Sequence, residues 1–167
     1  MPKTRGAWQL LVKINDLIYR AFTVITVIAL VILVVTVFMQ VLGRYVFHLS
    51  TPEAEEIAIY SFMWLVLLAA ANGVRDHSHL TADLLPNTLG PLGDRVIATL
   101  TYIVVGVLAV VFLIWGTEYA VMGLHRFSDT MGFQMFYMYV TLPICAFAML
   151  LFLAERVVLT WRSEPTS

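Results

Sequence analysis

The sequence predicts an all-α integral membrane protein with four transmembrane helices. Of its 167 residues, 60% are hydrophobic and 13% are charged, whereas a soluble domain has about 45–50% apolar and about 25% charged residues. The charges leave four long uncharged segments, as a bilayer requires, because ionisable side chains are costly inside it. We expect residues 1–167 to form a single membrane domain. The composition excludes a soluble domain, and the single cysteine excludes a disulfide-rich secreted scaffold.

Each uncharged segment is long enough for a helical span. A helix needs about 20 residues, at about 1.5 Å per residue, to cross about 30 Å of hydrocarbon. The first span is the most apolar and holds 15 Val, Ile, Leu or Phe side chains. Pro143 should kink the fourth span, because proline removes one backbone hydrogen bond. The expected spans are approximately residues 21–43, 57–74, 96–117 and 130–154.

The segment before the first span carries a helical pattern of its own. Residues 7–19 place apolar side chains such as Leu10 and Ile14 on one side, with Lys13 and Asp16 on the other. This pattern predicts either an amphipathic helix on the membrane surface or an aqueous extension of the first span. No cleavage pattern follows the apolar run, so we expect an uncleaved anchor rather than a signal peptide.

The orientation in the membrane follows from the distribution of Lys and Arg. The N-terminal tail, the second loop and the C-terminal tail hold eight of them, whereas the first and third loops hold two, Arg44 and Arg126. Because cytoplasmic segments are enriched in Lys and Arg, both termini are expected in the cytoplasm.

The spans contain little that could perform chemistry. Their inner two-thirds hold no ionisable residue, which argues against a proton-coupled exporter and against haem ligands inside the bundle. Only Pro143 interrupts a span, whereas transporter sites usually lie at paired broken helices. We therefore expect no enzyme, and no catalytic, cofactor-binding or metal-binding residue. The net charge of −1 offers no basic face for nucleic acid.

Several residues are better suited to contacts between helices. Small residues at four-residue spacing let helices approach closely in lipid, as at Ala69 with Gly73 and at Gly116 with Ala120. These faces would pack either inside a four-helix bundle or against a partner subunit, and both alternatives remain open.

A charged pair is expected between the first two spans. Arg44 should lie at the same membrane depth as Glu55 and Glu56, across a short loop, and could form an ion pair with one of them. The alternatives are an arginine that anchors the helix at the interface and acids that stabilise a helix N-terminus.

This same region carries a resemblance to a known family. An ordered set of residues resembles the small membrane subunit (Q, or DctQ-type) of tripartite ATP-independent periplasmic (TRAP) transporters. The chain departs from the family pattern at Glu53 and at residues 69–71. The matching residues are Gln40, Arg44, Tyr45, Phe47, Pro52, Glu55, Glu56, Trp64, Arg75, His79, Asp83, Leu84 and Leu85.

The resemblance implies an accessory scaffold role in a bacterial inner membrane. In this family a large multi-span permease subunit holds the substrate and sodium sites and moves as an elevator, while a periplasmic binding protein delivers an organic acid. The small subunit would bind the permease and hold no cofactor, with sodium expected on the permease. The alternatives are a self-contained homo-oligomeric transporter or channel and a membrane anchor of a redox complex.

The residues expected to make inter-helix or partner contacts come from all three lines of argument. They are Gln40, Arg44, Tyr45, Glu55, Glu56, Trp64, Ala69, Gly73, Arg75, His79, Asp83, Gly116 and Ala120.

Overall fold

The described part of the chain consists almost entirely of helices. The structure, a computed structural model, describes residues 3–49, 51–76 and 90–162, and side chains for residues 11–49, 51–76 and 99–157. Four helical segments of the described chain are long and apolar enough to cross a membrane, which confirms the prediction of an all-α protein with four membrane-spanning helices. The helices are α1 (Lys3–Tyr45), α2 (Pro52–Asp76), α4 (Gly90–Gly123), the short α5 (Phe136–Tyr139) and α6 (Thr141–Arg162).

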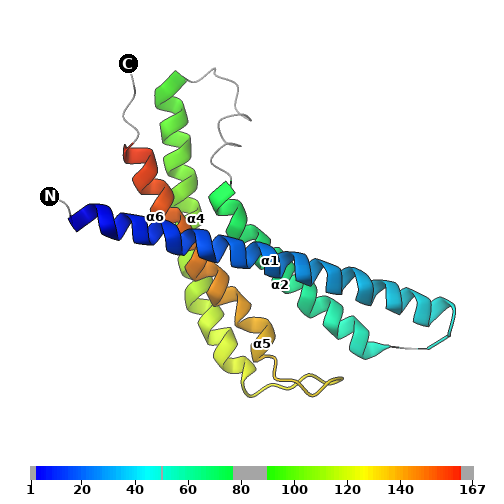
Figure 1. Cartoon of the computed structure of the whole chain (residues 1–167). Coiled ribbons are helices and arrows are strands. Elements are labelled where there is room, and N and C mark those ends of the chain that lie inside the picture. The colour runs from blue at the N-terminus through cyan, green and yellow to red at the C-terminus, as the bar shows by residue number, and fades with distance from the viewer. Residues whose placement is uncertain (1–2, 50, 77–89, 163–167) are drawn as a thin grey trace.

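The helices form two pairs that cross each other. Helix α1 packs along α2, and α4 packs along α6, while α2 and α6 make the main contact between the pairs. Figure 1 shows the α1–α2 pair crossing the α4–α6 pair near the middle of the helices. The hydrophobic core lies at this crossing. It is built from Phe22 of α1, Leu68 and Ala71 of α2, and Cys145, Ala148 and Phe152 of α6.

The segment before the first span belongs to the same helix as the span. Helix α1 has 43 residues without a break, so residues 7–19 extend the first span rather than form a separate surface helix. Their burial also differs from that of an amphipathic surface helix. Asn15 is 2% exposed, whereas Leu11, Ile14 and Leu17 are 46–70% exposed. Asn15 therefore faces the bundle, whereas Leu11, Ile14 and Leu17 face outward together with the charged Lys13 and Asp16.

Helix α1 meets α2 along a regular seam. The less exposed positions of its membrane segment recur at alternating three- and four-residue spacing, which is typical of left-handed helix pairing. Outside this seam, α1 exposes a nearly continuous surface of Val, Ile, Leu and Phe side chains. The seam positions are Phe22, Thr26, Ala29, Leu33, Thr36, Gln40 and Gly43.

The fourth span begins later than its predicted start. Residues 130–135 belong to a compact loop in which Phe127 and Gln134 form an isolated β-bridge. Gly132 has a φ of +68°, a backbone region that favours glycine. The span expected at 130–154 therefore begins at Phe136.

Pro143 lies in the fourth span, where α5 meets α6, and it is the third residue of α6. Val140, between the two helices, keeps right-handed helical angles of φ −62° and ψ −22°. Its N–H group donates to the Phe136 carbonyl oxygen, and its own carbonyl oxygen accepts from Ile144 N–H. Because proline has no N–H group, Pro143 cannot form the corresponding bond to Tyr139. The kink expected at Pro143 stays a prediction.

The two small-residue pairs differ in their surroundings. Gly116 and Ala120 are buried where α4 packs on α6, and a Cβ atom at Gly116 would lie 2.8 Å from Leu142 Cδ2. Ala69 is exposed on α2, and Gly73 is half-buried. Internal packing therefore accounts for the pair on α4, whereas Ala69 faces outward.

We predict that Gly123→Ala destabilises the bundle by about 1–3 kcal/mol, because a close-packed site has no room for an added methyl group. A Cβ atom at Gly123 would lie 2.8 Å from the backbone nitrogen of Phe136, which a rotamer change cannot relieve. Gly43→Ala is the matched control, since its Cβ atom would lie 3.6 Å from Thr51 Cγ2. Thermal unfolding in detergent measures both variants. Equal melting temperatures for the two would contradict the proposed close packing.

Candidate functional site

The most connected polar group of the described chain is a cluster around Arg75, near the end of α2. Its guanidinium Nη1 donates a hydrogen bond to the carbonyl oxygen of Asn15, at 3.1 Å. Nη2 forms an ion pair with Asp16 and lies 3.8 Å from Glu155 Oε1. Asn15 Nδ2 in turn donates to Glu155 Oε2, at 2.6 Å. We call Asn15, Asp16, Arg75 and Glu155 the Arg75 cluster; it joins α1, α2 and α6.

Three of the four side chains of this cluster are largely shielded, whereas the Asp16 side chain is half exposed. Asn15 is 2% exposed and Glu155 is 9% exposed. The Arg75 guanidinium also lies over two aromatic rings, 5.2 Å from the centre of Tyr19 and 5.7 Å from that of Phe152. Such cation–π contacts strengthen when water is excluded. The charges are therefore stabilised by one another and by aromatic faces.

Further hydrogen bonds near the cluster join the same three helices. Tyr19 Oη donates to Asp76 at 3.1 Å, and Asn72 Nδ2 donates to Thr23 Oγ1, also at 3.1 Å. The Arg156 guanidinium donates to the carbonyl oxygen of Arg75. That oxygen lies in the last described turn of α2, so this bond joins α2 to α6.

The sequence indicated Arg75 as a contact residue but gave no reason to select Asn15 or Glu155. Glu155 directly follows the expected span 130–154, and Asn15 lies between Lys13 and Asp16 in the segment before the first span. One available signal was that Arg75 and Glu155 have opposite charges and stand at the same expected membrane side. Buried charges need such partners, but the spacing of residues along the chain cannot identify them.

A second polar cluster lies at the opposite end of α2, around Glu56. Its carboxylate accepts hydrogen bonds from the hydroxyl groups of Tyr60, Ser128 and Thr130. Ser128 Oγ also accepts the backbone N–H of Met131, at 3.1 Å. Tyr60 is one helical turn from Glu56, whereas Ser128 and Thr130 belong to the loop between α4 and α5. Glu56 therefore fastens this loop to α2.

The expected ion pair between Arg44 and a glutamate is not formed. No ion pair within the described part of the chain includes Arg44, Glu55 or Glu56. Glu56 is already engaged by the loop hydroxyl groups. The connection between α1 and α2 at this end comes instead from Gln40 Nε2, which donates to the carbonyl oxygen of Ala54 at 2.8 Å.

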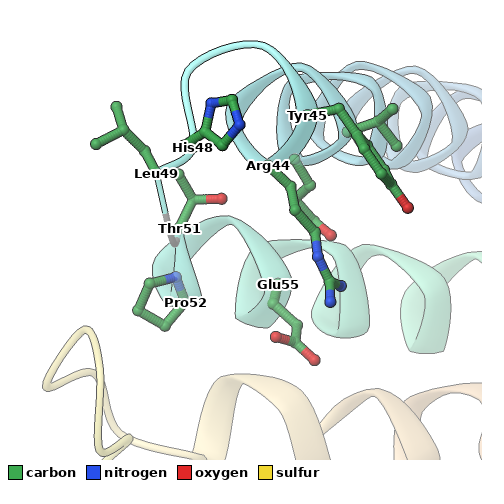
Figure 2. Close-up of a pocket in the computed structure, with 9 residues that line it drawn as sticks. Arg44, Tyr45, His48, Leu49, Thr51, Pro52 and Glu55 are labelled. Atoms are coloured by element: carbon green, nitrogen blue, oxygen red, sulfur yellow. The ribbon is translucent and has the colours of Figure 1, made fainter.

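Arg44 and Glu55 contribute instead to an open pocket between the end of α1 and the start of α2. Figure 2 shows the Arg44 side chain extending from α1 toward α2, where the Glu55 side chain lies. The pocket has a volume of about 710 Å³. His48 lies on its rim with a φ of +54°, in the left-handed region, where the chain turns from α1 toward α2. The lining residues are Gln40, Val41, Arg44, Tyr45, His48, Leu49, Thr51, Pro52 and Glu55.

The other candidate residues occupy varied positions. Trp64 Nε1 donates to the carbonyl oxygen of Tyr137 at 3.2 Å, which joins α2 to α5. Tyr45 is 73% exposed at the end of α1. His79 and Asp83 lie outside the described residues. Among the residues that the structure describes, no group of three or more His, Cys, Asp or Glu side chains could hold a metal ion.

We predict that Arg75→Leu costs about 3–5 kcal/mol of stability, because it leaves the buried Glu155 carboxylate without its cation. Asp16→Asn should cost less than about 1 kcal/mol, since the Asp16 side chain is half exposed and solvent screens it. The double variant Arg75→Leu/Glu155→Leu should recover part of the loss. Unfolding in detergent, followed by circular dichroism, tests all three. A double variant no more stable than Arg75→Leu would contradict the pairing.

We predict that Glu56→Ala loosens the loop between α4 and α5. The loop then loses two hydroxyl contacts that hold it to α2, so amide exchange in the loop should accelerate severalfold. The informative amides are those of Ser128 and Met135, which bond to backbone oxygens across the loop at 2.8 and 2.9 Å. Glu55→Ala is the matched control, because its carboxylate faces the pocket. Hydrogen–deuterium exchange that is equal in both variants would refute the role of Glu56.

Comparison with known proteins identifies the family. The family described as "Tripartite ATP-independent periplasmic transporters, DctQ component" matches residues 33–163, which include the pocket, the Glu56 cluster, and Arg75 and Glu155. A TRAP transporter small permease protein of Haemophilus influenzae is 30% identical over 84 residues, 50% of this chain and 52% of the relative. The chain thus aligns with about half the length of that curated relative. The match over residues 33–163 covers most of the chain, which therefore belongs to the DctQ-component family of TRAP transporters.

Proposed function

We propose that this chain is the accessory scaffold subunit of a sodium-coupled TRAP importer of organic acids. The family match over residues 33–163 is the observation that carries the proposal. In this role the chain binds the large multi-span permease subunit and enlarges the stationary frame against which a transport domain slides. The substrate and sodium sites then belong to the permease, and a periplasmic substrate-binding protein delivers the organic acid.

The packing of the helices supports a static role. The Arg75 cluster ties three helices together at one end, and the Glu56 cluster fastens a loop to α2 at the other. At Gly106 and Gly116, α4 lies so close to α6 that an added Cβ atom would be 3.0 Å from Leu153 Cδ2 or 2.8 Å from Leu142 Cδ2. Close packing and hydrogen bonds between helices hold a bundle in one arrangement. This is what a frame requires when a neighbouring domain moves.

The outer surface supports a role in the membrane. Large apolar side chains cover most of α1 beyond its seam with α2, and many lie exposed on α4. Exposed apolar surface of this extent is stable only against lipid or another apolar protein surface. We propose that lipids and the permease subunit share this surface.

We propose that the chain lies in a bacterial inner membrane with both termini in the cytoplasm. The Lys and Arg residues at the two ends of the bundle support this orientation. Lys13, Arg20, Arg75 and Arg156 lie toward the end that holds the Arg75 cluster, whereas Arg44 and Arg126 lie toward the other. Positive charges are enriched on the cytoplasmic side. The loop between α4 and α5 then faces the periplasm, within reach of a substrate-binding protein.

The scaffold role is tested by reconstitution into sodium-free vesicles, with uptake measured in external buffer that contains sodium or lacks it. We expect no uptake of organic acids by the purified 167-residue chain, and sodium-dependent uptake only when the permease subunit and the binding protein are added. Co-purification of the chain with the permease measures assembly. Substrate uptake by the chain alone would overturn the scaffold role and favour a self-contained transporter.

The orientation is tested by cysteine labelling in a Cys145→Ser background. Asp129→Cys lies in the exposed loop between α4 and α5, and Lys13→Cys lies at the other end of the bundle. A membrane-impermeant maleimide should label Asp129→Cys in intact spheroplasts, and Lys13→Cys only after the membrane is opened. The reverse pattern would place both termini outside.

A further inference from the structure

The pocket between α1 and α2 carries one charge of each sign without a bond between them. Arg44 comes from the last turn of α1, and Glu55 from the first turn of α2. Both line the same space of about 710 Å³, and their side chains lie near one another in Figure 2. Neither takes part in an ion pair within the described chain. The pocket is therefore charged at two points and has room for an occupant.

This charge arrangement restricts what the pocket can hold. A simple anion would gain from Arg44 but would be repelled by Glu55, and a simple cation would meet the opposite conflict. A zwitterion can satisfy both groups if its charges are separated by a few bonds. Hydrogen bonds in which donor and acceptor are both charged are the strongest of their kind. The pocket thus favours a ligand with an anionic and a cationic group.

The position of the pocket points to a lipid. The first span ends at Tyr45, and the second begins at Pro52, so the pocket lies where two membrane helices reach the headgroup region. Val41 lines the pocket. Val34, Val37 and Phe38 lie one to two turns further along α1, and their side chains are 43–60% exposed. An apolar strip therefore runs from the pocket along the membrane-facing side of α1.

We propose that the pocket binds a zwitterionic phospholipid with a primary ammonium group, such as phosphatidylethanolamine. The phosphate accepts hydrogen bonds from the Arg44 guanidinium, and the ammonium donates to the Glu55 carboxylate. The acyl chains lie along the apolar strip of α1. A primary ammonium has N–H donors for Glu55, whereas the trimethylammonium of phosphatidylcholine has none. Phosphatidylglycerol carries the phosphate but no cation to meet Glu55.

The test compares three lipids with matched acyl chains on the purified full-length chain. Native mass spectrometry measures the fraction of protein that keeps one lipid after phosphatidylethanolamine, phosphatidylcholine or phosphatidylglycerol is added. We expect retention of phosphatidylethanolamine to exceed that of the others by about fivefold, the scale of a partly exposed charge pair. Soluble phosphoethanolamine serves as the headgroup without acyl chains, and should compete only weakly because it cannot use the apolar strip.

Three variants assign the selectivity to the pocket. Arg44→Gln should lower the retention of phosphatidylethanolamine and of phosphatidylglycerol, since both present a phosphate. Glu55→Gln should remove the preference for phosphatidylethanolamine over phosphatidylglycerol while leaving the phosphate contact in place. Glu53→Gln is the matched control, because this exposed carboxylate lies in the same turn of α2 but does not line the pocket; it should behave as the unmodified chain.

Several outcomes would overturn the proposal. Equal retention of all three lipids by the unmodified chain would show that the pocket does not distinguish between their headgroups. Selectivity that survives in both Arg44→Gln and Glu55→Gln would place the lipid elsewhere. If Arg44→Gln released the permease subunit from the complex while leaving lipid retention unchanged, the pocket would be a protein contact. Circular dichroism must match among the variants, so that loss of binding is not loss of folding.

Discussion

The structure depends on one constraint, which is that lipid satisfies no hydrogen bond. A polar group that the helices carry into the bundle therefore needs a partner within the protein. The Arg75 cluster supplies such partners across three helices, because Arg75, Asn15 and Glu155 contribute donors and acceptors from α2, α1 and α6. Among the described residues, the buried atoms Asn15 Oδ1, Thr26 Oγ1, Asn72 Oδ1 and Thr141 Oγ1 have no such partner. The crossing of the two helix pairs lies beside this cluster, and its core includes Phe152, whose ring also covers the Arg75 guanidinium.

The same constraint explains why Asn15 of α1 faces inward. Asn15 is buried, and Leu17 is 70% exposed. Lipid accepts an exposed leucine, whereas an asparagine facing lipid would lose its hydrogen bonds. The charged Lys13 and Asp16 stay exposed, so the pattern of apolar residues correctly predicted a helix but did not show which residues face the bundle.

The opposite end of the bundle shows how neighbouring acidic residues acquire different roles. Glu55 and Glu56 are adjacent, so their side chains leave α2 about 100° apart. One direction leads to the hydroxyl groups of Ser128 and Thr130, and the other to the pocket that Arg44 shares. Glu55 thus faces the pocket, whereas Glu56 holds the loop. Our lipid proposal depends on this division of roles.

The sequence by itself determined the number of spans, their approximate ends and the family, because bilayer thickness fixes how long an uncharged segment must be. It also indicated Arg75, Arg44 and the glutamates as contact residues. Only the tertiary structure decided their partners. Asn15 and Glu155 are 140 residues apart in the chain, and Glu56 and Ser128 are 72 apart. Such pairs form where helices cross, and the crossing is set by packing among all the helices, which no local spacing records.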